Sequence, residues 1–396
     1  MHNIRLKICL VLLTVCFILL MGSALAETAR DITAQAVMTA STHKPSSVRV
    51  SDRDYETIWN SLRGRRENLE FETEEPCFGV YLCSGMEKTA PWIVEEKQDN
   101  KWVQVARGEG RYGHEYVALP GITHFRVRLE STAQLVFSVN EIYLLSEGDL
   151  PDWVQIWQPP VEKADLMILV AHPDDEMLFF GGMIPTYAGE RQMDVVVCYL
   201  TCGTPGRRSE LLNGLWYCGV RTYPDIGTFW DKYSLKLDKQ YKTWGQNTVW
   251  SYVTELFRRY RPEVVATQDV NGEYGHGAHR VCADACLHCV ETAADETKYA
   301  KSAKAYGAWQ VKKLYIHMYA ENQVEFDWDI PLESQGGKTG FETAVEAYKL
   351  YVSQQQPQYQ VEPRDSVKSC YLFGLAYSAV GPDVEKKDMF ENIPVR

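Results

Sequence analysis

Basic residues are in short supply in this 396-residue sequence: 41 lysines and arginines stand against 53 aspartates and glutamates, a net charge of −12. A surface that binds nucleic acid needs a basic excess, so this balance excludes nucleic acid as a partner. The sequence has no run of like charge and no low-complexity tract, so nothing indicates a disordered tail. A phosphate loop, a dinucleotide-binding glycine fingerprint and a nucleophile elbow are also missing, which argues against nucleotide chemistry and serine hydrolysis.

Long apolar runs are scarce as well. One stretch, residues 8–21, follows Arg5 and Lys7 and precedes an Ala-Leu-Ala at residues 24–26. This is the pattern of a secretory signal peptide with an A-x-A cleavage site, and the run is too short to span a bilayer comfortably. We therefore expect residues 1–26 to be removed, the mature protein to be secreted to the cell envelope or the extracellular space, and no stable membrane span to remain.

The mature chain would contain an odd number of cysteines. Two of the eleven lie in the signal segment, so at least one of the other nine is unpaired. Cys77 and Cys83 could bridge two neighbouring strands, which the sequence does not decide. Cys282, Cys286 and Cys289 look like a metal cluster, but their spacing of four and three puts them on one helical face. We interpret these three as ordinary buried core residues.

Short stretches of alternating polarity dominate residues 27–148, and no helix of useful length competes with them. The predicted strands are residues 78–82, 92–94, 102–105, 116–119, 125–129, 135–137 and 142–145. Strands at this spacing make an all-β sandwich. Residues 51–59 and 140–144 resemble the discoidin or coagulation-factor type C family of galactose-binding-like jelly rolls. The resemblance implies a carbohydrate- or surface-binding module; a purely structural sandwich is the alternative.

A proline-rich linker and a second domain follow. Residues 149–163 contain Pro151, Pro159 and Pro160, too much proline for the interior of a strand or helix. Two tryptophans in this linker predict that it packs on one domain rather than swinging free. In residues 164–396 strands alternate with helices, which predicts an α/β domain with a mostly parallel sheet.

The hexapeptide Ala-His-Pro-Asp-Asp-Glu at residues 171–176 directly follows a predicted buried strand, residues 166–170. Pro173 suits the first turn of a helix that would begin near Asp174. Residues at this point of an α/β sheet face the crevice where such folds bind ligands. His172 and Asp175, three apart, could share one metal ion and leave Asp174 free as a base. A helix start with acidic caps is the simpler alternative.

Two further histidines, His276 and His279, come after a second predicted strand, residues 264–267, and open a helix. They repeat the position of the first motif at the end of a strand. His317 stands alone in another strand, and we interpret it as a core or supporting residue rather than a ligand. Between the motifs, the aromatic loop of residues 221–246 could stack on sugar rings or simply pack on the domain.

These groups can be assembled into one catalytic centre. His172, Asp175 and His279 would give zinc two nitrogens and an oxygen and leave a fourth position open, the pattern of a catalytic site. Asp174 would act as general base toward a water molecule, and His276 would stabilise an oxyanion or protonate a leaving amine. The set suits hydrolysis of an amide or an ester.

Three motifs together resemble the PIG-L/LmbE-like N-acetylglucosaminyl deacetylases: residues 171–176, Arg207-x-x-Glu210 before Cys218-Gly219, and His276-x-x-His279. The resemblance runs from about Asp165 to the C-terminus. It implies a Rossmann-like fold.

The same resemblance implies roles for particular residues. It implies that His172, Asp175 and His279 hold zinc, that Asp174 is the general base, and that Arg207 contacts the substrate. The family usually has Asp or Asn before the last ligand, where this sequence has Ala278.

The resulting hypothesis is a secreted zinc-dependent hydrolase that removes acetyl groups from N-acetylated, GlcNAc-type sugars of envelope or extracellular glycans. Its expected partner is a carbohydrate, including polymeric glycan. An O-deacetylase or another metallohydrolase is one alternative. A non-catalytic glycan-binding protein on the same fold is the other, which Ala278 keeps open.

Overall fold

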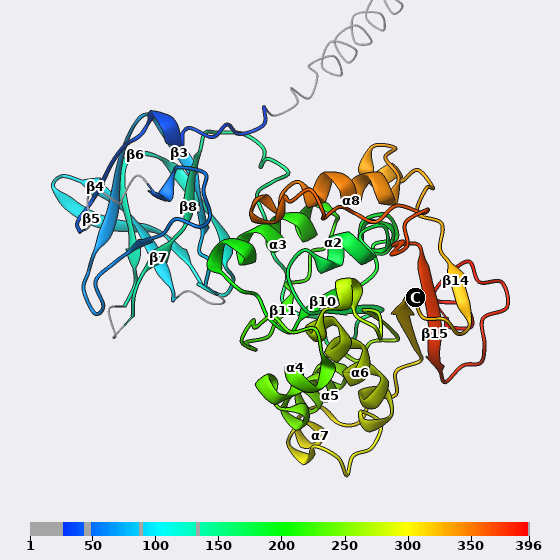
Figure 1. Ribbon diagram of the computed structural model, residues 1–396. Coiled ribbons are helices and arrows are strands. Elements are labelled where there is room, and N and C mark those ends of the chain that lie inside the picture. The colour runs from blue at the N-terminus through cyan, green and yellow to red at the C-terminus, as the bar shows by residue number, and fades with distance from the viewer. Residues whose placement is uncertain (1–26, 43–48, 87–89, 132–134, 395–396) are drawn as a thin grey trace, which may run out of the picture.

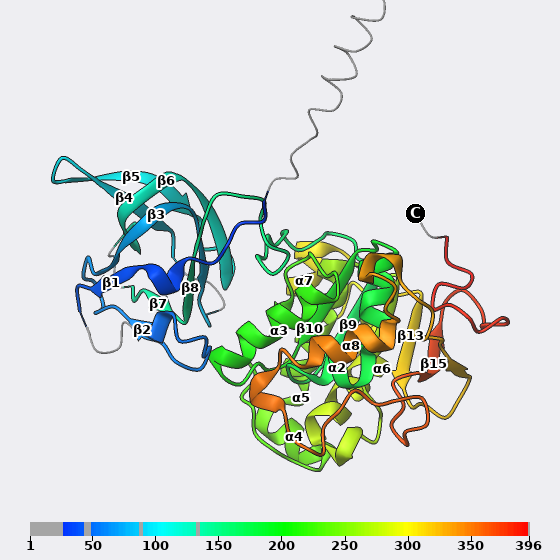
Figure 2. The same ribbon diagram turned by 90° about the horizontal axis from the view of Figure 1, so that it is seen from above.

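The computed structural model describes residues 27–42, 49–86, 90–131 and 135–394. The predicted signal peptide lies outside these residues. Within the described ranges no helix has both the length and the apolar character needed to cross a bilayer. Two bodies of secondary structure lie side by side, an all-β part that ends with the strand closing at Leu145 and an α/β part built from the remainder (Figures 1 and 2).

The N-terminal part is a six-stranded antiparallel sheet in the order β1-β3-β6-β4-β5, with β8 also paired to β3. A separate pair, β2 with β7, faces its core. The strands are β1 (Val37–Ala40), β2 (Trp59–Asn60), β3 (Asn68–Cys83), β4 (Trp92–Gln98), β5 (Lys101–Gly108), β6 (His114–Leu129), β7 (Ser138–Val139) and β8 (Glu141–Leu145). The predicted all-β fold is confirmed.

The predicted strand boundaries were less accurate. Residues 116–119 and 125–129 were expected as two strands but belong to the single 16-residue β6. The chain continues through Pro120 and Gly121 because the register with β3 shifts nearby, which lets one long pair of strands bend instead of breaking. The strand expected at residues 135–137 is found at Ser138–Val139.

The C-terminal part is a seven-stranded sheet in the order β11-β10-β9-β12-β13-β15-β14. Its strands are β9 (Leu166–Val170), β10 (Val195–Tyr199), β11 (Asp225–Ile226), β12 (Val264–Thr267), β13 (Lys313–His317), β14 (Gln323–Glu325) and β15 (Leu372–Ser378). The first five run parallel, β15 runs antiparallel to β13, and the edge strand β14 runs antiparallel to β15 and so in the direction of the first five. The predicted mostly parallel α/β sheet is confirmed.

Helices cover both faces of this sheet (Figure 1). They are α2 (Asp175–Phe180), α3 (Pro205–Tyr217), α4 (Leu237–Trp244), α5 (Gln246–Tyr260), α6 (Gly277–Thr292), α7 (Ala300–Tyr306) and α8 (Gly340–Tyr348), with short helical turns η1 (Thr33–Gln35), η3 (Pro185–Glu190), η4 (Glu273–Gly275), η5 (Glu333–Gln335) and η6 (Val352–Gln354). Alternate residues of β9 serve opposite faces: Ile168 packs with α2, α3 and α8, whereas Met167 packs with α4, α5 and α6. A strand buried on both faces explains its continuous apolar run.

The cysteines behave as core residues. Every cysteine in the described part of the chain is free and buried, so Cys77 and Cys83 form no bridge. Cys282, Cys286 and Cys289 lie on the inner face of α6 within the hydrophobic core, which confirms their interpretation as packing residues.

The linker joins the two parts through specific contacts. Trp153 packs on Tyr143 of the β-sandwich, while Trp157 lies in the core of the α/β part. The expectation that the linker packs on one domain was therefore wrong, because its two indoles divide between both. Gln155 bonds to His114 at 2.9 Å and donates to Asn213 at 2.7 Å, which ties β6 to α3. The exact boundaries, at residues 148 and 163, remain a prediction.

The contact at His114 makes the stability of the protein sensitive to acid. Burial lowers the pKa of His114 to about 3, although its bond to Gln155 opposes the shift. An unfolded histidine titrates near pH 6.5, so between these values the unfolded state binds more protons, and stability is lost as the pH falls below about 6.5. Between pH 7 and pH 5 this residue should remove about 2 kcal/mol from the free energy of unfolding.

His114→Gln keeps a polar side chain but cannot gain the proton. Urea unfolding at pH 7 and pH 5 should therefore show a drop in stability that is smaller than in the wild type by about 2 kcal/mol. An equal drop in both proteins would contradict the assignment.

Candidate active site

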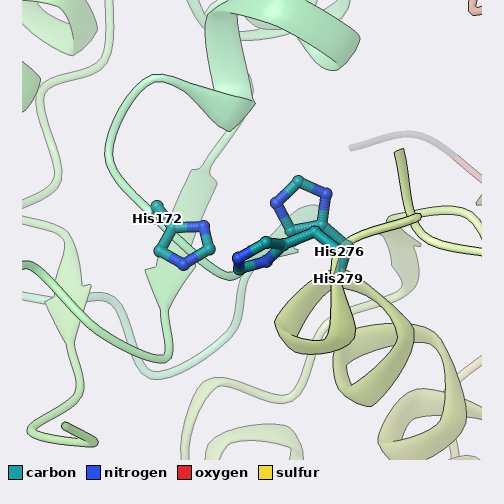
Figure 3. A group of neighbouring side chains, drawn as sticks. All are labelled: His172, His276 and His279. Carbon is teal, nitrogen blue, oxygen red and sulfur yellow. The ribbon is translucent and has the colours of Figure 1, made fainter. Parts of the chain in front are cut away.

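The two histidine motifs meet at one edge of the parallel sheet. β9 ends at Val170 and its neighbour β12 ends at Thr267, and the two strands run in the same direction. The loop after β9 carries His172, and the segment after β12 leads to His276 and to His279 on α6. Figure 3 shows the three imidazole rings gathered between the strand end and the start of α6. The predicted convergence of the two motifs is present.

The turn at Asp174 is tighter than expected. Asp174 has φ 106° and ψ −33°, a region that L-residues rarely adopt, and it is the N-cap of α2 rather than its first residue. Pro173 therefore precedes the N-cap and does not occupy the first helical turn, which corrects our prediction. This turn brings the Asp175 carboxylate back to the His172 amide, with 2.8 Å between Oδ2 and N. Strain of this kind persists where the surroundings hold it, commonly at functional sites.

Asp175 lies between two histidines. Its Oδ2 is 3.2 Å from His172 Nδ1, and its Oδ1 is 3.3 Å from His279 Nε2. Two ligands of a tetrahedral zinc at about 2.1 Å lie roughly 3.4 Å apart, so each of these two contacts, made by a different oxygen of Asp175, has the separation expected of a pair of zinc ligands. Burial raises the pKa of Asp175, but the charges of His279 and His172 outweigh it and lower the pKa well below its usual range.

His276 is a third imidazole at the same place. A donor atom of His276 lies within 4.8 Å of donor atoms of both His172 and His279. Burial, with the charges of His172 and His279, lowers the pKa of His276 to about 3, so it is neutral. Its Nδ1 is buried and has no hydrogen-bond partner in the described structure. Ala278, at the position where Asp or Asn was expected, is buried and offers no side-chain acceptor.

Glu273 was missed by the sequence analysis. Its Oε2 lies 3.0 Å from His279 Nδ1 and its Oε1 lies 2.7 Å from His317 Nδ1, so one buried carboxylate holds both rings. His317 is fully buried and contacts Ser369 through its other nitrogen, as its interpretation as a supporting residue predicted. Glu273 opens the short helical turn η4 and is recognisable only after the fold places it beside His279.

Arg207 and Asp231 close the other side of the site. Arg207 Nη2 lies 3.1 Å from Asp174 Oδ1, so this arginine contacts the proposed base directly. Burial raises the pKa of Asp174, and the Arg207 charge only partly opposes that shift. Asp231 Oδ1 lies 3.5 Å from His172 Nε2. Asp231, like Glu273, was not among the predicted residues, because it comes from a loop without periodicity.

All six predicted site residues line one pocket of about 310 Å³. Asp231, Tyr233, Tyr274 and Tyr359 complete much of its wall. The aromatic loop thus divides between its two proposed roles: Tyr233 reaches the pocket, whereas Phe229 and Trp244 pack against each other on the helical layer. The pocket combines a metal-compatible donor set with a separate carboxylate and aromatic walls.

Glu273→Gln tests the support behind His279. The amide cannot hold both histidines as a carboxylate does, and loss of such a supporting group typically weakens metal affinity by about 10- to 100-fold. Competition with a chromophoric chelator should show zinc affinity reduced on that scale. Glu362→Gln is the matched control, a buried glutamate bonded to Ser366 and outside the ligand set. Equal affinities for Glu273→Gln and wild type would contradict this role.

The fold and the site define an α/β protein with a pocket of histidines and aspartates at the carboxyl edge of a parallel sheet. Residues 167–290 match the family described as PIG-L: GlcNAc-PI de-N-acetylase, and this part of the chain is a PIG-L family domain.

Curated relatives share this region at modest identity. The 1D-myo-inositol 2-acetamido-2-deoxy-alpha-D-glucopyranoside deacetylase 1 of Catenulispora acidiphila is 28% identical over 219 residues, 48% of this chain and 65% of the relative. The deacetylase with the same substrate in its name from Mycobacteroides abscessus is 30% identical over 188 residues, 40% of this chain and 62% of the relative. The chain thus spans less than two thirds of either relative.

Solved structures show more distant likenesses. The conserved protein TT1542 from Thermus thermophilus is 19% identical with a TM-score of 0.35, covering 48% of this chain and 80% of that one. An N,N'-diacetylchitobiose deacetylase from Pyrococcus horikoshii is 15% identical with a TM-score of 0.38, covering 50% and 73%. An F5/8 type C domain from Bacteroides fragilis is 14% identical with a TM-score of 0.26, covering 32% and 99%.

Proposed function

We propose that the protein is a zinc-dependent hydrolase that removes acetyl groups from N-acetylated, GlcNAc-type sugars. One observation carries the proposal: Asp175 stands between His172 and His279, while the carboxylate of Asp174 lies beside them in the same pocket. The PIG-L domain and the deacetylase names of the relatives support the choice of an acetamido sugar as substrate.

His172, Asp175 and His279 would hold the ion. Zinc, when bound, would supply Lewis acidity toward the acetamide carbonyl and toward water. Asp174 would take a proton from that water at its carboxylate and return it to the leaving amine. A carboxylate whose pKa is raised is better matched to this exchange than an ordinary aspartate. Arg207, 3.1 Å from Asp174, would hold that carboxylate in place.

His276 lines the same pocket as Asp174 and Arg207. As a neutral imidazole it would donate an N–H to the oxyanion that develops on the carbonyl oxygen. Tyr233, Tyr274 and Tyr359 would contact the sugar ring. Tyrosines suit a carbohydrate, because the face of the aromatic ring can pack on a pyranose and the phenol hydroxyl can form a hydrogen bond with it.

We also propose that the β-sandwich, residues 27–148, binds carbohydrate and brings the enzyme to polymeric glycan of the envelope or extracellular space. The signal-like residues 1–26 and the galactose-binding-like motifs at residues 51–59 and 140–144 support this role. The linker at residues 149–163 would then connect a targeting domain to the deacetylase domain at residues 164–396.

Acetate release from matched N-acetyl and O-acetyl sugars tests the reaction. We expect release from N-acetylated oligosaccharides and little from O-acetyl esters of the same sugar. Preferential ester hydrolysis would favour an O-deacetylase. The unpaired Nδ1 of His276 beside Ala278 favours a second candidate, a non-catalytic glycan-binding protein, and glycan binding without release of acetate from either substrate would favour it.

A further inference from the structure

A second cavity, of about 460 Å³, lies where the β-sandwich meets the α/β part. The sandwich contributes Arg111 and Tyr112, and the α/β part contributes Arg208 and Arg259 among others. None of its lining residues lines the pocket of the three histidines. The cavity therefore differs from the candidate active site both in place and in chemistry.

Arg208 is the unusual residue of this cavity. Its side chain is nearly buried, with 9% of the residue exposed, and its Nη1 has no hydrogen-bond partner. Among the described residues no carboxylate forms an ion pair with it. The Arg208 side chain shares a hydrogen bond with Tyr223, a neutral partner that leaves the charge without a counter-ion: burial raises the pKa of Tyr223, and the Gly113 amide, the Arg208 charge and this hydrogen bond oppose that shift. An unpaired buried charge is costly, so such a group is expected to meet an anion.

A second arginine of the cavity, Arg259, also has an N–H group without a hydrogen-bond partner. Arg259 Nη2 pairs with Asp225 Oδ2 at 2.9 Å, but Arg259 Nε is buried without a partner. Asp225 also accepts from two tyrosines, since Tyr252 donates to its Oδ1 at 2.6 Å and Tyr260 to its Oδ2 at 2.7 Å. The one carboxylate among the residues that line the cavity thus already has three donors, and three arginines line the same cavity in a protein whose net charge is −12.

The position of Arg208 on its helix strengthens the argument. Arg207 and Arg208 are the third and fourth residues of α3, after the N-cap Thr204, and the first turn contains no acidic residue. The partial positive charge of a helix N-terminus disfavours cations there. Asp174 offsets this for Arg207, at 3.1 Å, but nothing comparable in the described part of the chain offsets it for Arg208. An anion beside the Arg208 guanidinium would relieve the unpaired charge.

We propose that this interdomain cavity binds an oxyanion, a phosphate or carboxylate group, held by Arg208 and Arg259, with Arg111 closing over it from the β-sandwich. The group belongs either to a free ion or to an acidic sugar. Binding there would stabilise the contact between the two parts of the molecule, because its arginines come from both.

Calorimetric titration of the full-length protein at constant ionic strength tests the proposal, with inorganic phosphate, glucose 1-phosphate and glucuronate as probes and chloride as the reference salt. We expect saturable binding of at least one probe. Arg208→Gln should weaken it by about tenfold or more, the scale of a lost charge-assisted hydrogen bond. If a sugar probe binds more tightly than inorganic phosphate, the natural ligand is an acidic sugar. If inorganic phosphate binds more tightly, the natural ligand is a free ion.

Two further variants keep the test decisive. Arg111→Gln removes an exposed charge of the cavity and should weaken binding, whereas Arg65→Gln, an exposed arginine of the same sandwich that does not line the cavity, should not. Without any probe, Arg208→Gln should unfold at a temperature no lower than the wild type, because it removes an unpaired buried charge. Equal binding by wild type and Arg208→Gln, no binding of any probe, or a marked loss of stability in probe-free buffer would overturn the proposal.

Discussion

Replacing Asp174 with asparagine should leave zinc in place and slow acetate release by about 100-fold or more, the usual scale for loss of a general base. The Asp174 carboxylate contacts Arg207, while the contacts between the proposed zinc donors run through Asp175. Asparagine tolerates positive φ better than most residues, so the turn at φ 106° should survive the change. Metal analysis and the turnover number of the same preparation measure both effects.

Asp231→Asn is the matched control for that experiment. It removes a carboxylate from the same pocket, 3.5 Å from His172, without touching the proposed base. We expect a much smaller effect on the turnover number. Comparable losses in both variants would mean that the charge of the pocket, and not a proton acceptor at Asp174, limits the reaction. Loss of zinc from Asp174→Asn would exchange the roles of the two adjacent aspartates.

Replacing His279 with alanine should remove most of the zinc and reduce acetate release to the level of metal-stripped enzyme. His279 is oriented by Glu273 on one nitrogen and faces Asp175 with the other, at 3.3 Å, so alanine leaves that ligand position empty. Asp175→Asn should weaken zinc binding as well, since a neutral amide is a poorer ligand than a carboxylate. Zinc content per chain, measured after dialysis, is the readout.

His276→Ala separates two possible ligand sets, because donor atoms of His172, His276 and His279 also lie within 4.8 Å of one another. We expect this variant to keep zinc and lose rate, since His276 is assigned to the oxyanion. If His276→Ala lost zinc and Asp175→Asn kept it, the metal would be held by three histidines.

The sequence predicted the meeting of the two motifs because strand periodicity and chain order fix it. Residues 166–170 are apolar throughout and residues 264–267 nearly so, as strands buried on both faces must be, and parallel neighbours bring their carboxyl ends to one edge. The role of His317 as a supporting residue followed from its isolation in a strand.

Other features depend on tertiary contacts and could not be predicted locally. The positive φ of Asp174 accompanies the return of the Asp175 carboxylate to the His172 amide. Because of this turn, α2 begins at Asp175, later than the position of Pro173 predicted. Glu273 comes from the three-residue helical turn η4 and Asp231 from an irregular loop, and both acquire a role only beside His279 and His172. The burial of Arg208 without a counter-ion depends on contacts between the β-sandwich and the α/β part, which the local sequence does not encode.

Acetate release before and after metal removal tests the central claim most directly. The wild-type protein, stripped with a chelator, should lose its activity on N-acetylated oligosaccharides and recover it when about one zinc ion per chain is restored. Asp175→Asn, treated in the same way, should recover little. Undiminished release from the stripped wild-type protein, or no release from the zinc-loaded protein, would contradict a zinc-dependent deacetylase at His172, Asp175 and His279.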